Sequence, residues 1–193
     1  MIHVDGFPTG AAIAWLPQPF ETLFRRAPAP STMAKTSRAD LRTTADYQFG
    51  RGAGEALFPA AAHLEIDYST GGRPSQIHAP DGRLASMGTD GRFTLGFAGG
   101  RRLHDQLDAA AYRVYVGDES EPFVRDGENT FAKFIDRCGE EIRAGDEVLV
   151  LHESGELLGV GRAELAASEI LDFETGMAVM VREGVDEYVD SSS

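Results

Sequence analysis

Side chains that could carry out covalent or metal-dependent chemistry are few and scattered along the 193 residues. The single cysteine, Cys138, excludes an internal disulfide and a thiolate-clustered zinc or iron–sulfur site, because each needs several cysteines on one chain. Two histidines at H-x-x-x-H or H-E-x-x-H spacing would share one helix face, and no such pair occurs. We therefore expect neither a metal site nor a cofactor from the five histidines, which are His3, His63, His78, His104 and His152.

The acidic residues and Cys138 also form no recognisable catalytic set. We interpret the acidic run of Asp105, Asp108, Asp118 and Glu119 as a solvated junction between domains rather than a general acid–base pair. No Ser/His/Asp or Cys/His arrangement is present. A catalytic (β/α)₈ barrel takes about 250 residues, more than the chain holds. We expect the chain not to be an enzyme, and keep a small RNA- or nucleotide-modifying enzyme as the last-ranked alternative.

The charge is acidic and unevenly distributed. Acidic residues number 31 against 18 basic ones, which gives a net charge of −13, and the surplus lies in residues 113–193. Only Lys35 and Lys133 are lysines, so the other basic residues are arginines, which fork bidentately onto carboxylates or phosphates. An acidic chain nearly free of lysine fits the molar-salt cytoplasm of halophilic archaea, where screening is strong. An ordinary acidic protein would explain the charge but not the missing lysines.

Residues 1–32 are rich in proline and have no sustained hydrophobic period. We interpret them as a disordered extension, with translation starting at Met33. The alternative makes Trp15, Phe20 and Phe24 a docking segment. No apolar run approaches the roughly 20 residues that span a bilayer, and a signal peptide is not indicated, so we expect a cytoplasmic protein without a membrane partner.

Residues 33–112 predict a small α+β domain. Ser37 followed by Asp40 matches a capping box, so a helix should follow. The segment G-R-G-A-G at 50–54 should split this helix at a tight bend; it lacks the spacing of a phosphate-cradling loop. Apolar side chains recur every four residues across both pieces and should line one face: Leu41, Ala45, Phe49, Ala53 and Leu57.

An antiparallel meander should follow the helix. Residues 63–69 alternate between polar and apolar, and D-G-R turns at Asp81 and Asp90 separate R-L-A-S-M from R-F-T-L-G-F-A. We expect a bend at Gly99-Gly100 and a second helix over 103–112. This completes the first domain.

Residues 113–187 predict a small, nearly closed β structure with two helices. Short strands rich in Val, Leu and Ile are separated by turn signals at Gly145-Asp146 and Ser154-Gly155. Helices are expected in E-S-E-P-F-V-R-D-G-E and in A-S-E-I-L-D-F-E-T-G. Residues 188–193 are predicted to be a flexible tail.

The order of these segments carries a resemblance. The run D-G-E-N-T-F-A-K-F, then I-R-A-G-D-E-V-L-V, then E-L-L-G-V-G-R-A resembles a PUA domain, an RNA-binding module whose fold is a pseudo-β-barrel. The earlier L-R-T-T-A-D-Y-Q-F-G-R-G-A-G-E-A-L-F and G-R-F-T-L-G-F-A-G-G-R-R-L resemble the C2 domain that precedes PUA in archaeal tRNA-guanine transglycosylases. From Met33 to Val185 the chain therefore resembles the C-terminal part of an archaeosine-forming tRNA-guanine transglycosylase or of its archaeosine synthase relative.

This resemblance implies a non-catalytic RNA-binding protein that docks the acceptor stem and 3′ end of tRNA for a tRNA-modification enzyme. The chain has neither the length for the catalytic barrel of those enzymes nor the cysteines of their zinc site. The implied partners are tRNA or another structured RNA and a catalytic transglycosylase or synthase subunit; DNA is not expected. The first alternative is an acidic protein–protein adaptor that has lost RNA binding.

The resemblance also implies the RNA-binding residues. We expect Gly127 at a close backbone approach or a positive φ, and Lys133, the only lysine of the acidic part, as the best phosphate contact. The alternative pairs Lys133 with Asp136 or Glu128. In the first domain, arginines beside glycines could clamp phosphates or form ordinary surface ion pairs. The full set is Arg125, Gly127, Asn129, Thr130, Phe131, Lys133, Val179, Val181, Arg182, Arg51, Arg101 and Arg102.

Overall fold

The computed structural model describes residues 36–107 and 111–191, so the predicted extension over residues 1–32 lies outside the described residues. Helix α1 (Arg38–Phe49) begins at the predicted capping box. The Asp40 carboxylate accepts a hydrogen bond from the Ser37 N–H at 2.8 Å, and the Ser37 hydroxyl accepts one from the Asp40 N–H at 3.2 Å. Hydrogen bonds from the Ser37 backbone and then its side chain lower the pKa of Asp40. The predicted helix start is confirmed.

The glycine segment after α1 forms the predicted bend. Gly50 and Gly52 have φ values of 95° and 96°, which residues other than glycine rarely adopt, and α2 (Ala53–Leu57) follows. The backbone N–H groups of Gly52 and Gly54 donate to the Asp46 carboxylate at 3.0 and 2.8 Å. A side chain of the protein thus takes the position that a phosphate would need. The five predicted apolar positions are all buried: Leu41, Ala45, Phe49, Ala53 and Leu57.

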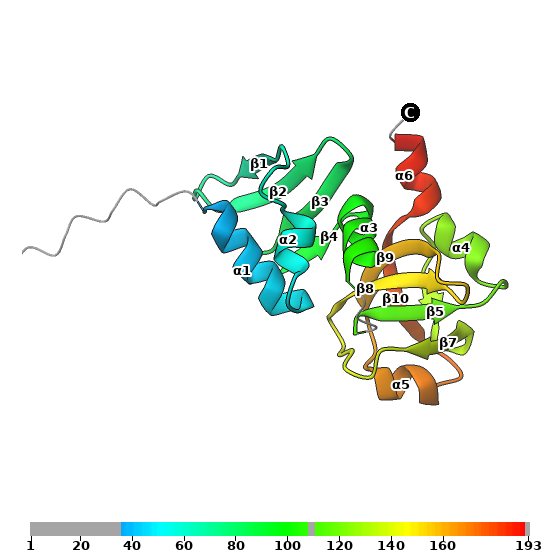
Figure 1. Cartoon of the computed structure of the whole chain (residues 1–193). Coiled ribbons are helices and arrows are strands. Elements are labelled where there is room, and N and C mark those ends of the chain that lie inside the picture. The colour runs from blue at the N-terminus through cyan, green and yellow to red at the C-terminus, as the bar shows by residue number, and fades with distance from the viewer. Residues whose placement is uncertain (1–35, 108–110, 192–193) are drawn as a thin grey trace, which may run out of the picture. The chain divides into compact units, whose positions relative to one another are not determined.

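Four antiparallel strands follow in the order β1-β2-β3-β4, as the meander prediction required (Figure 1). Both D-G turns occur where predicted, with Gly82 and Gly91 at positive φ. The second strand was not named from the sequence, because its polar residues mask the alternation. The strands are β1 (Glu65–Tyr68), β2 (Pro74–Ala79), β3 (Gly82–Met87) and β4 (Phe93–Leu95).

Helix α3 (Phe97–Gln106) corrects two predictions. The expected bend at Gly99-Gly100 lies inside this helix, and the expected helix over 103–112 ends at Gln106, with 108–110 outside the described residues. A Cβ atom on Gly99 would lie 2.0 Å from the Leu84 carbonyl oxygen, and one on Gly100 would lie 2.2 Å from Val160 Cγ1. The glycines are therefore needed for close packing on β3 and β9, not for a turn.

The remaining chain forms a six-stranded sheet in the order β6-β10-β9-β8-β5-β7, antiparallel except for β5 beside β8 (Figure 1). The predicted strands and two helices are present, with a further helix at the end. The elements are β5 (Arg113–Val116), α4 (Glu121–Arg125), β6 (Thr130–Phe131), the 3₁₀ turn η2 (Ala132–Phe134), β7 (Ile135–Cys138), β8 (Glu147–His152), β9 (Leu157–Ala163), α5 (Ala167–Asp172), β10 (Met177–Gly184) and α6 (Val185–Ser191).

The sheet must curl into a barrel because its two edge strands are neighbours in sequence. β6 ends at Phe131 and β7 begins at Ile135. In a flat sheet these edges would be about 24 Å apart, at about 4.8 Å per strand. The intervening three residues span at most about 14 Å. The fold is therefore α+β, with a nearly closed barrel after the meander, as predicted.

The predicted flexible tail is wrong for the described residues after 187. α6 continues to Ser191, and the Tyr188 ring lies 5.0 Å from that of Phe97. The Tyr188 hydroxyl donates to the carbonyl oxygen of Asp81. Burial of an aromatic ring with its hydroxyl paired holds this segment against the meander.

None of the helices in the described residues has the length and apolar character needed to span a membrane.

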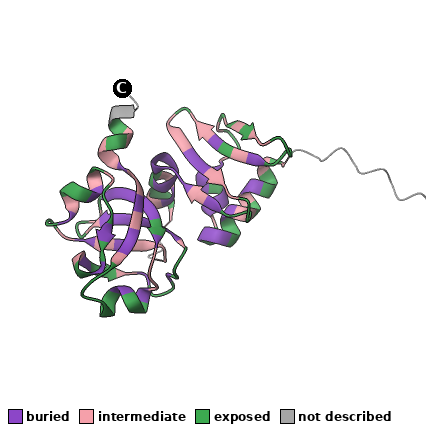
Figure 2. Ribbon diagram, turned by 180° about the vertical axis from the view of Figure 1, so that it is seen from behind, coloured by how far each residue is buried: buried purple, intermediate pink, exposed green. Residues whose placement is uncertain are grey.

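Strand β8 joins two hydrophobic cores because its successive residues face two opposite sides that are both buried. Figure 2 shows buried residues both in the meander with its helices and in the barrel. Val148 and Val150 belong to the barrel interior, whereas Leu149 and Leu151 pack with the residues of the meander and its helices. The described residues, 36–107 and 111–191, belong to one compact unit.

Two carboxylates fasten the start of α3 to the barrel. Glu147, only 4% exposed, accepts from the Leu95 N–H at 2.9 Å. Glu183 accepts from the Phe97 N–H at 3.1 Å and from Arg83 at 2.9 Å. Because buried backbone N–H groups need partners, these carboxylates fix where β4 passes into α3.

We predict that Gly99→Ala lowers the free energy of unfolding by about 1–3 kcal/mol, since a backbone carbonyl cannot move aside for the new methyl group. Alanine is the better helix former by about 1 kcal/mol, so helix propensity alone predicts the opposite sign. Urea denaturation measures the difference. Gly71→Ala is the control, because its Cβ would meet only Ser69 Oγ at 3.9 Å. A Gly99→Ala protein at least as stable as the parent would contradict the packing argument.

Candidate nucleic-acid interface

The loop before β6 lies against the last barrel strand. Thr130 and Phe131 of β6 pair with Val179 and Met177 of β10. The Asn129 side-chain oxygen accepts a hydrogen bond from the Val181 N–H at 3.1 Å. The structure thus brings together the two segments that the sequence nominated for RNA contact.

Gly127 has the positive φ expected of it, at 81°. A Cβ atom there would lie 2.9 Å from the Glu187 carboxylate of α6. The positive φ is what requires glycine at this position, since the Glu187 carboxylate is the end of a flexible, exposed side chain and can move aside. A carboxylate next to the loop opposes a phosphate at the same place.

Three of the nominated side chains are accessible at the barrel edge, Asn129 among them. Phe131 is 46% exposed, and Lys133 is exposed on η2. The Lys133 ammonium lies 4.3 Å from the centroid of the Phe134 ring. The alternative pairing of Lys133 with Asp136 or Glu128 is not among the ion pairs of the described residues. An exposed aromatic ring and an exposed cation therefore share this edge.

Three nominated side chains face the barrel interior, which corrects their expected role. Thr130, Val179 and Val181 are 2%, 0% and 7% exposed. Val179 and Val181 are two residues apart and so share the inner face of β10. Only the backbone of these residues can face a ligand.

Arg182 is held by an internal carboxylate. Its guanidinium donates to both oxygens of the buried Glu147, at 2.7 and 2.9 Å. This bidentate geometry uses the fork that a phosphate would require. Arg182 is therefore a structural residue.

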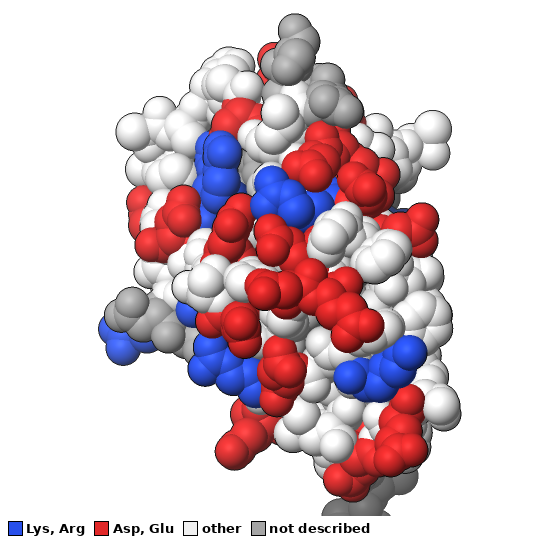
Figure 3. Space-filling view, turned by 90° about the vertical axis from the view of Figure 1, so that its right-hand side faces the viewer, with Lys and Arg blue, Asp and Glu red and all other residues white. Residues whose placement is uncertain are grey.

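Arg125 is also surrounded by carboxylates. Its guanidinium lies 2.8 Å from Glu156, 3.2 Å from Asp186 and 3.5 Å from Glu121. Hydrogen bonds to Glu156 and then Asp186 raise the pKa of Arg125. The face shown in Figure 3 has the same character, since its basic side chains lie beside acidic ones.

The nominated arginines of the meander and its helices also fall into two groups, one held by a carboxylate and one exposed without an ion pair. Arg102 donates to both Asp81 oxygens at 3.1 and 2.7 Å, so its phosphate-clamp role is corrected. Arg101 is exposed, with its guanidinium 5.5 Å from the Tyr188 ring. Arg51 is exposed at the bend before α2. Five basic side chains have neither an ion pair nor a hydrogen bond to another described residue: Arg51, Arg101, Lys133, Arg137 and Arg143.

Sequence reasoning missed a groove of about 560 Å³ beside α1. Tyr47, 93% exposed, lines it together with Tyr112, Arg92 and Arg143. The position of Tyr47 around the predicted helix was the sequence signal that could have placed it on the exposed face. Tyr47 lies two residues, or about 200°, beyond buried Ala45, so an aromatic ring was due on the polar face.

No nucleophilic cysteine is formed. Burial raises the pKa of the Cys138 thiol, and its sulfur lies 3.9 Å from the Ala167 carbonyl oxygen. Both features disfavour the thiolate.

The chain matches two protein families. Residues 39–110 match the patch-forming domain C2 of tRNA-guanine transglycosylase, and residues 112–185 match the PUA domain. Similar curated proteins include the tRNA-guanine(15) transglycosylase of Methanothermobacter thermautotrophicus, 46% identical over 75% of this chain, and that of Pyrococcus furiosus, 44% identical over 74%. The aligned region spans only 22% and 24% of their own lengths.

The chain is a PUA-domain protein that resembles the C-terminal part of archaeal tRNA-guanine transglycosylase. The resemblance inferred from sequence is thereby confirmed.

Solved structures support the fold of the joined C2 and PUA domains. A hypothetical protein from Pyrococcus horikoshii aligns with a TM-score of 0.63 at 19% identity, covering 82% of this chain and 98% of its own. A PUA-domain protein from Thermoplasma acidophilum aligns with a TM-score of 0.53 at 20% identity, covering 82% and 97%. At these identities the likeness establishes the fold alone.

We predict that Arg182→Ala lowers the free energy of unfolding by about 3 kcal/mol, because it leaves the Glu147 carboxylate of the PUA domain buried without its cation. The matched control is Arg162→Ala on neighbouring β9. Arg162 pairs with Glu164 near the surface, so its loss should cost less than about 1 kcal/mol. Chemical denaturation of both variants measures the difference, and equal losses would refute the structural role of Arg182.

Proposed function

We propose that the protein binds structured RNA, tRNA foremost, and presents it to a tRNA-modifying enzyme without itself catalysing the modification. The observation that carries this proposal is the edge formed by the Gly127 loop, β6 and β10, which leaves Phe131 and Lys133 exposed. The named relatives act on guanine 15 of tRNA, which supports tRNA as the ligand. The acceptor stem and 3′ end are the parts of tRNA that we assign to the PUA domain.

Recognition must depend on short-range contacts rather than on a long-range field. The net charge of −13 repels a polyanion, and Arg125 and Arg182 are occupied by carboxylates. Lys133 can reach one phosphate, Phe131 can stack on an unpaired base, and the backbone of the Gly127 loop can approach a sugar. Arg51 and Arg101 of the C2 domain remain available for further phosphates.

The partner that this role requires is a catalytic transglycosylase or synthase chain. The aligned region covers only about a quarter of the relatives' length, and this chain itself matches the C2 and PUA domains. We take the compartment to be the cytoplasm, and we retain the hypothesis that its salt is high, since it accounts for the scarcity of lysine.

The second candidate function is a protein–protein adaptor, and the carboxylates around Arg125 favour it. Glu121, Glu156 and Asp186 share one guanidinium, and Glu187 lies against the Gly127 loop. Such a surface suits a basic protein segment. Absence of binding to any tRNA would select this alternative.

We predict that Lys133→Glu weakens tRNA binding, since it replaces the exposed cation at the PUA edge with a repelling charge. Filter binding in molar KCl measures the affinity. The control is Arg143→Glu, which makes the same charge change at an exposed arginine of the groove beside α1, away from the Gly127 loop and β6. Equal losses in both variants would mean that only net charge matters and would contradict the assigned edge.

We also predict a shallow dependence of affinity on salt. With about three phosphate contacts, the slope of log K against log salt concentration should be about −2 to −3. Lys133→Glu should reduce its magnitude by about 1. Titrations of the same tRNA at several KCl concentrations measure both slopes. A parent slope of about −6 or steeper would require a basic surface that the described residues do not provide.

A further inference from the structure

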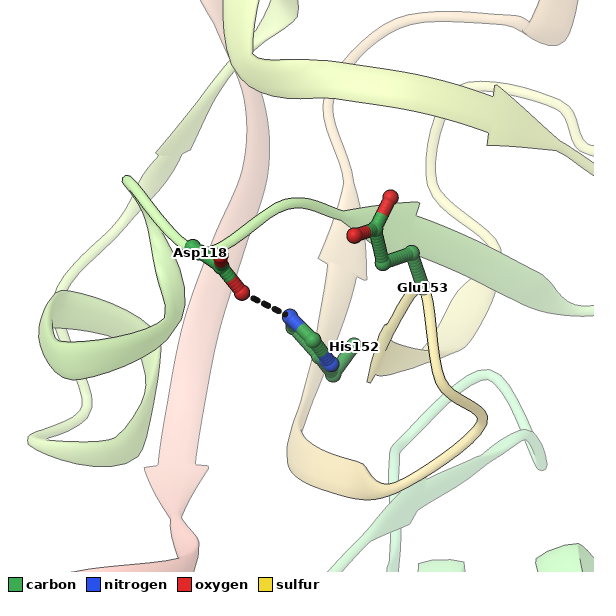
Figure 4. Close-up of side chains that lie close together, drawn as sticks. All are labelled: Asp118, His152 and Glu153. Atoms are coloured by element: carbon green, nitrogen blue, oxygen red, sulfur yellow. Dashed lines mark hydrogen bonds and ion pairs between the residues drawn. The ribbon is translucent and has the colours of Figure 1, made fainter.

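A histidine and three carboxylates lie together where the turn after β5 meets the β8–β9 hairpin (Figure 4). The ligand atoms of Asp118, His152 and Glu153 all lie within 4.8 Å of one another. The Nε2 atom of His152 is 3.0 Å from Asp118 Oδ1 and 3.9 Å from Glu121 Oε2. Figure 4 shows the imidazole pointing toward Asp118, with Glu153 beside it. This set belongs neither to the Gly127 loop nor to β10.

The His152 ring is oriented as a metal ligand would be. Its side chain is only 13% exposed, and its Nδ1 atom lies 2.8 Å from the Ser154 hydroxyl. A hydroxyl that accepts from Nδ1–H fixes the tautomer and leaves the Nε2 lone pair for a metal ion. The longer contact of Nδ1 with the Ser154 N–H, at 3.3 Å, would then be given up.

The local charge favours a bound cation. Arg125, which pairs with the neighbouring Glu121, also pairs with Glu156 and Asp186. The Asp118 carboxylate has only His152 as a partner among the described residues, and the Glu153 carboxylate has no hydrogen bond or ion pair there. Carboxylates in proximity repel one another, and a divalent ion between them would remove that repulsion.

We propose that Asp118, His152 and Glu153 form a surface site for a divalent transition-metal ion, zinc above all, that fastens the turn after β5 to the β8–β9 hairpin. One imidazole with carboxylates suits Zn²⁺ or Mn²⁺, whereas Mg²⁺ and Ca²⁺ prefer oxygen ligands alone. At metal–ligand distances of about 2.0 Å, tetrahedral ligand atoms lie about 3.3 Å apart. Asp118, with 90% of its side chain exposed, and the exposed Glu153 are free to close that gap, with water as the fourth ligand.

The proposal corrects the expectation of no metal site by a route that sequence spacing could not supply. Asp118 and His152 are 34 residues apart and meet because β5 and β8 pair in parallel, with Val116 opposite His152. The site does not depend on the RNA proposal.

The test uses the full chain, freed of any tag and stripped of metal, titrated with ZnCl₂ by calorimetry. We expect one site whose affinity falls at least about tenfold in His152→Gln. Asp118→Asn should also weaken binding, and it decides the matter if His152→Gln does not fold, because the Asp118 side chain is exposed. His78→Gln is the matched control: His78 Nε2 also lies near an aspartate, 3.9 Å from Asp67, but in no group of three ligands.

A second readout follows the histidine ring signals by NMR during the titration. The His152 ring protons should shift, and those of His78 should not. The proposal is overturned if the parent binds no Zn²⁺, if neither variant weakens binding, or if MgCl₂ competes with Zn²⁺ at equal concentration, which would mark a non-selective acidic surface.

Discussion

The pairing of two carboxylates, one buried and one half-buried, with backbone N–H groups at the start of α3 is the constraint on which the joined domains depend. Glu147 and Glu183 come from β8 and β10 of the PUA domain, and they accept from Leu95 and Phe97 on either side of Gly96. Each carboxylate also has a cation, Arg182 for the buried Glu147 and Arg83 for the half-buried Glu183. This arrangement fixes α3 between β3 and β9. The helix lies so close to both strands that a side chain at Gly99 or Gly100 would collide with them. The C2 and PUA domains therefore share a hydrophobic core.

The same constraint limits how the protein can meet RNA. Each arginine that holds the junction is unavailable for phosphate, and Arg102 and Arg125 are likewise occupied by carboxylates. What is left at the PUA edge is an exposed ring, an amide and a lysine, on Phe131, Asn129 and Lys133. Under the proposed function, a protein of this charge would recognise RNA by shape and local contact, because its net charge gives no long-range attraction to a polyanion. A metal ion at His152 would neutralise part of the remaining acidic surface, at Asp118 and Glu153.

Several elements were predictable because their causes are local. The Ser37–Asp40 capping box, the four-residue apolar repeat of α1 and the D-G turns each depend on residues a few positions apart. α3 was misplaced because Gly-Gly indicates a bend when only neighbours in sequence are considered. Its neighbours in space, Leu84 and Val160, lie 15 and 60 residues away from Gly99 and Gly100. Tyr188 was assigned to a tail for the same reason, since its partners Phe97 and Asp81 are distant in sequence.

The amino-acid sequence by itself determined the two-domain α+β order, the family resemblance and the conformation of Gly127, because turn residues, periodicity and positive φ are properties of short segments. Tertiary structure alone decided which nominated side chains face outward. Val179 and Val181 became core, and Arg182 became the counterion of Glu147. Tertiary structure also brought Asp118 to His152. Burial and charge pairing are set by residues far apart in the chain, so no local sequence pattern can specify which arginine will pair with a given carboxylate.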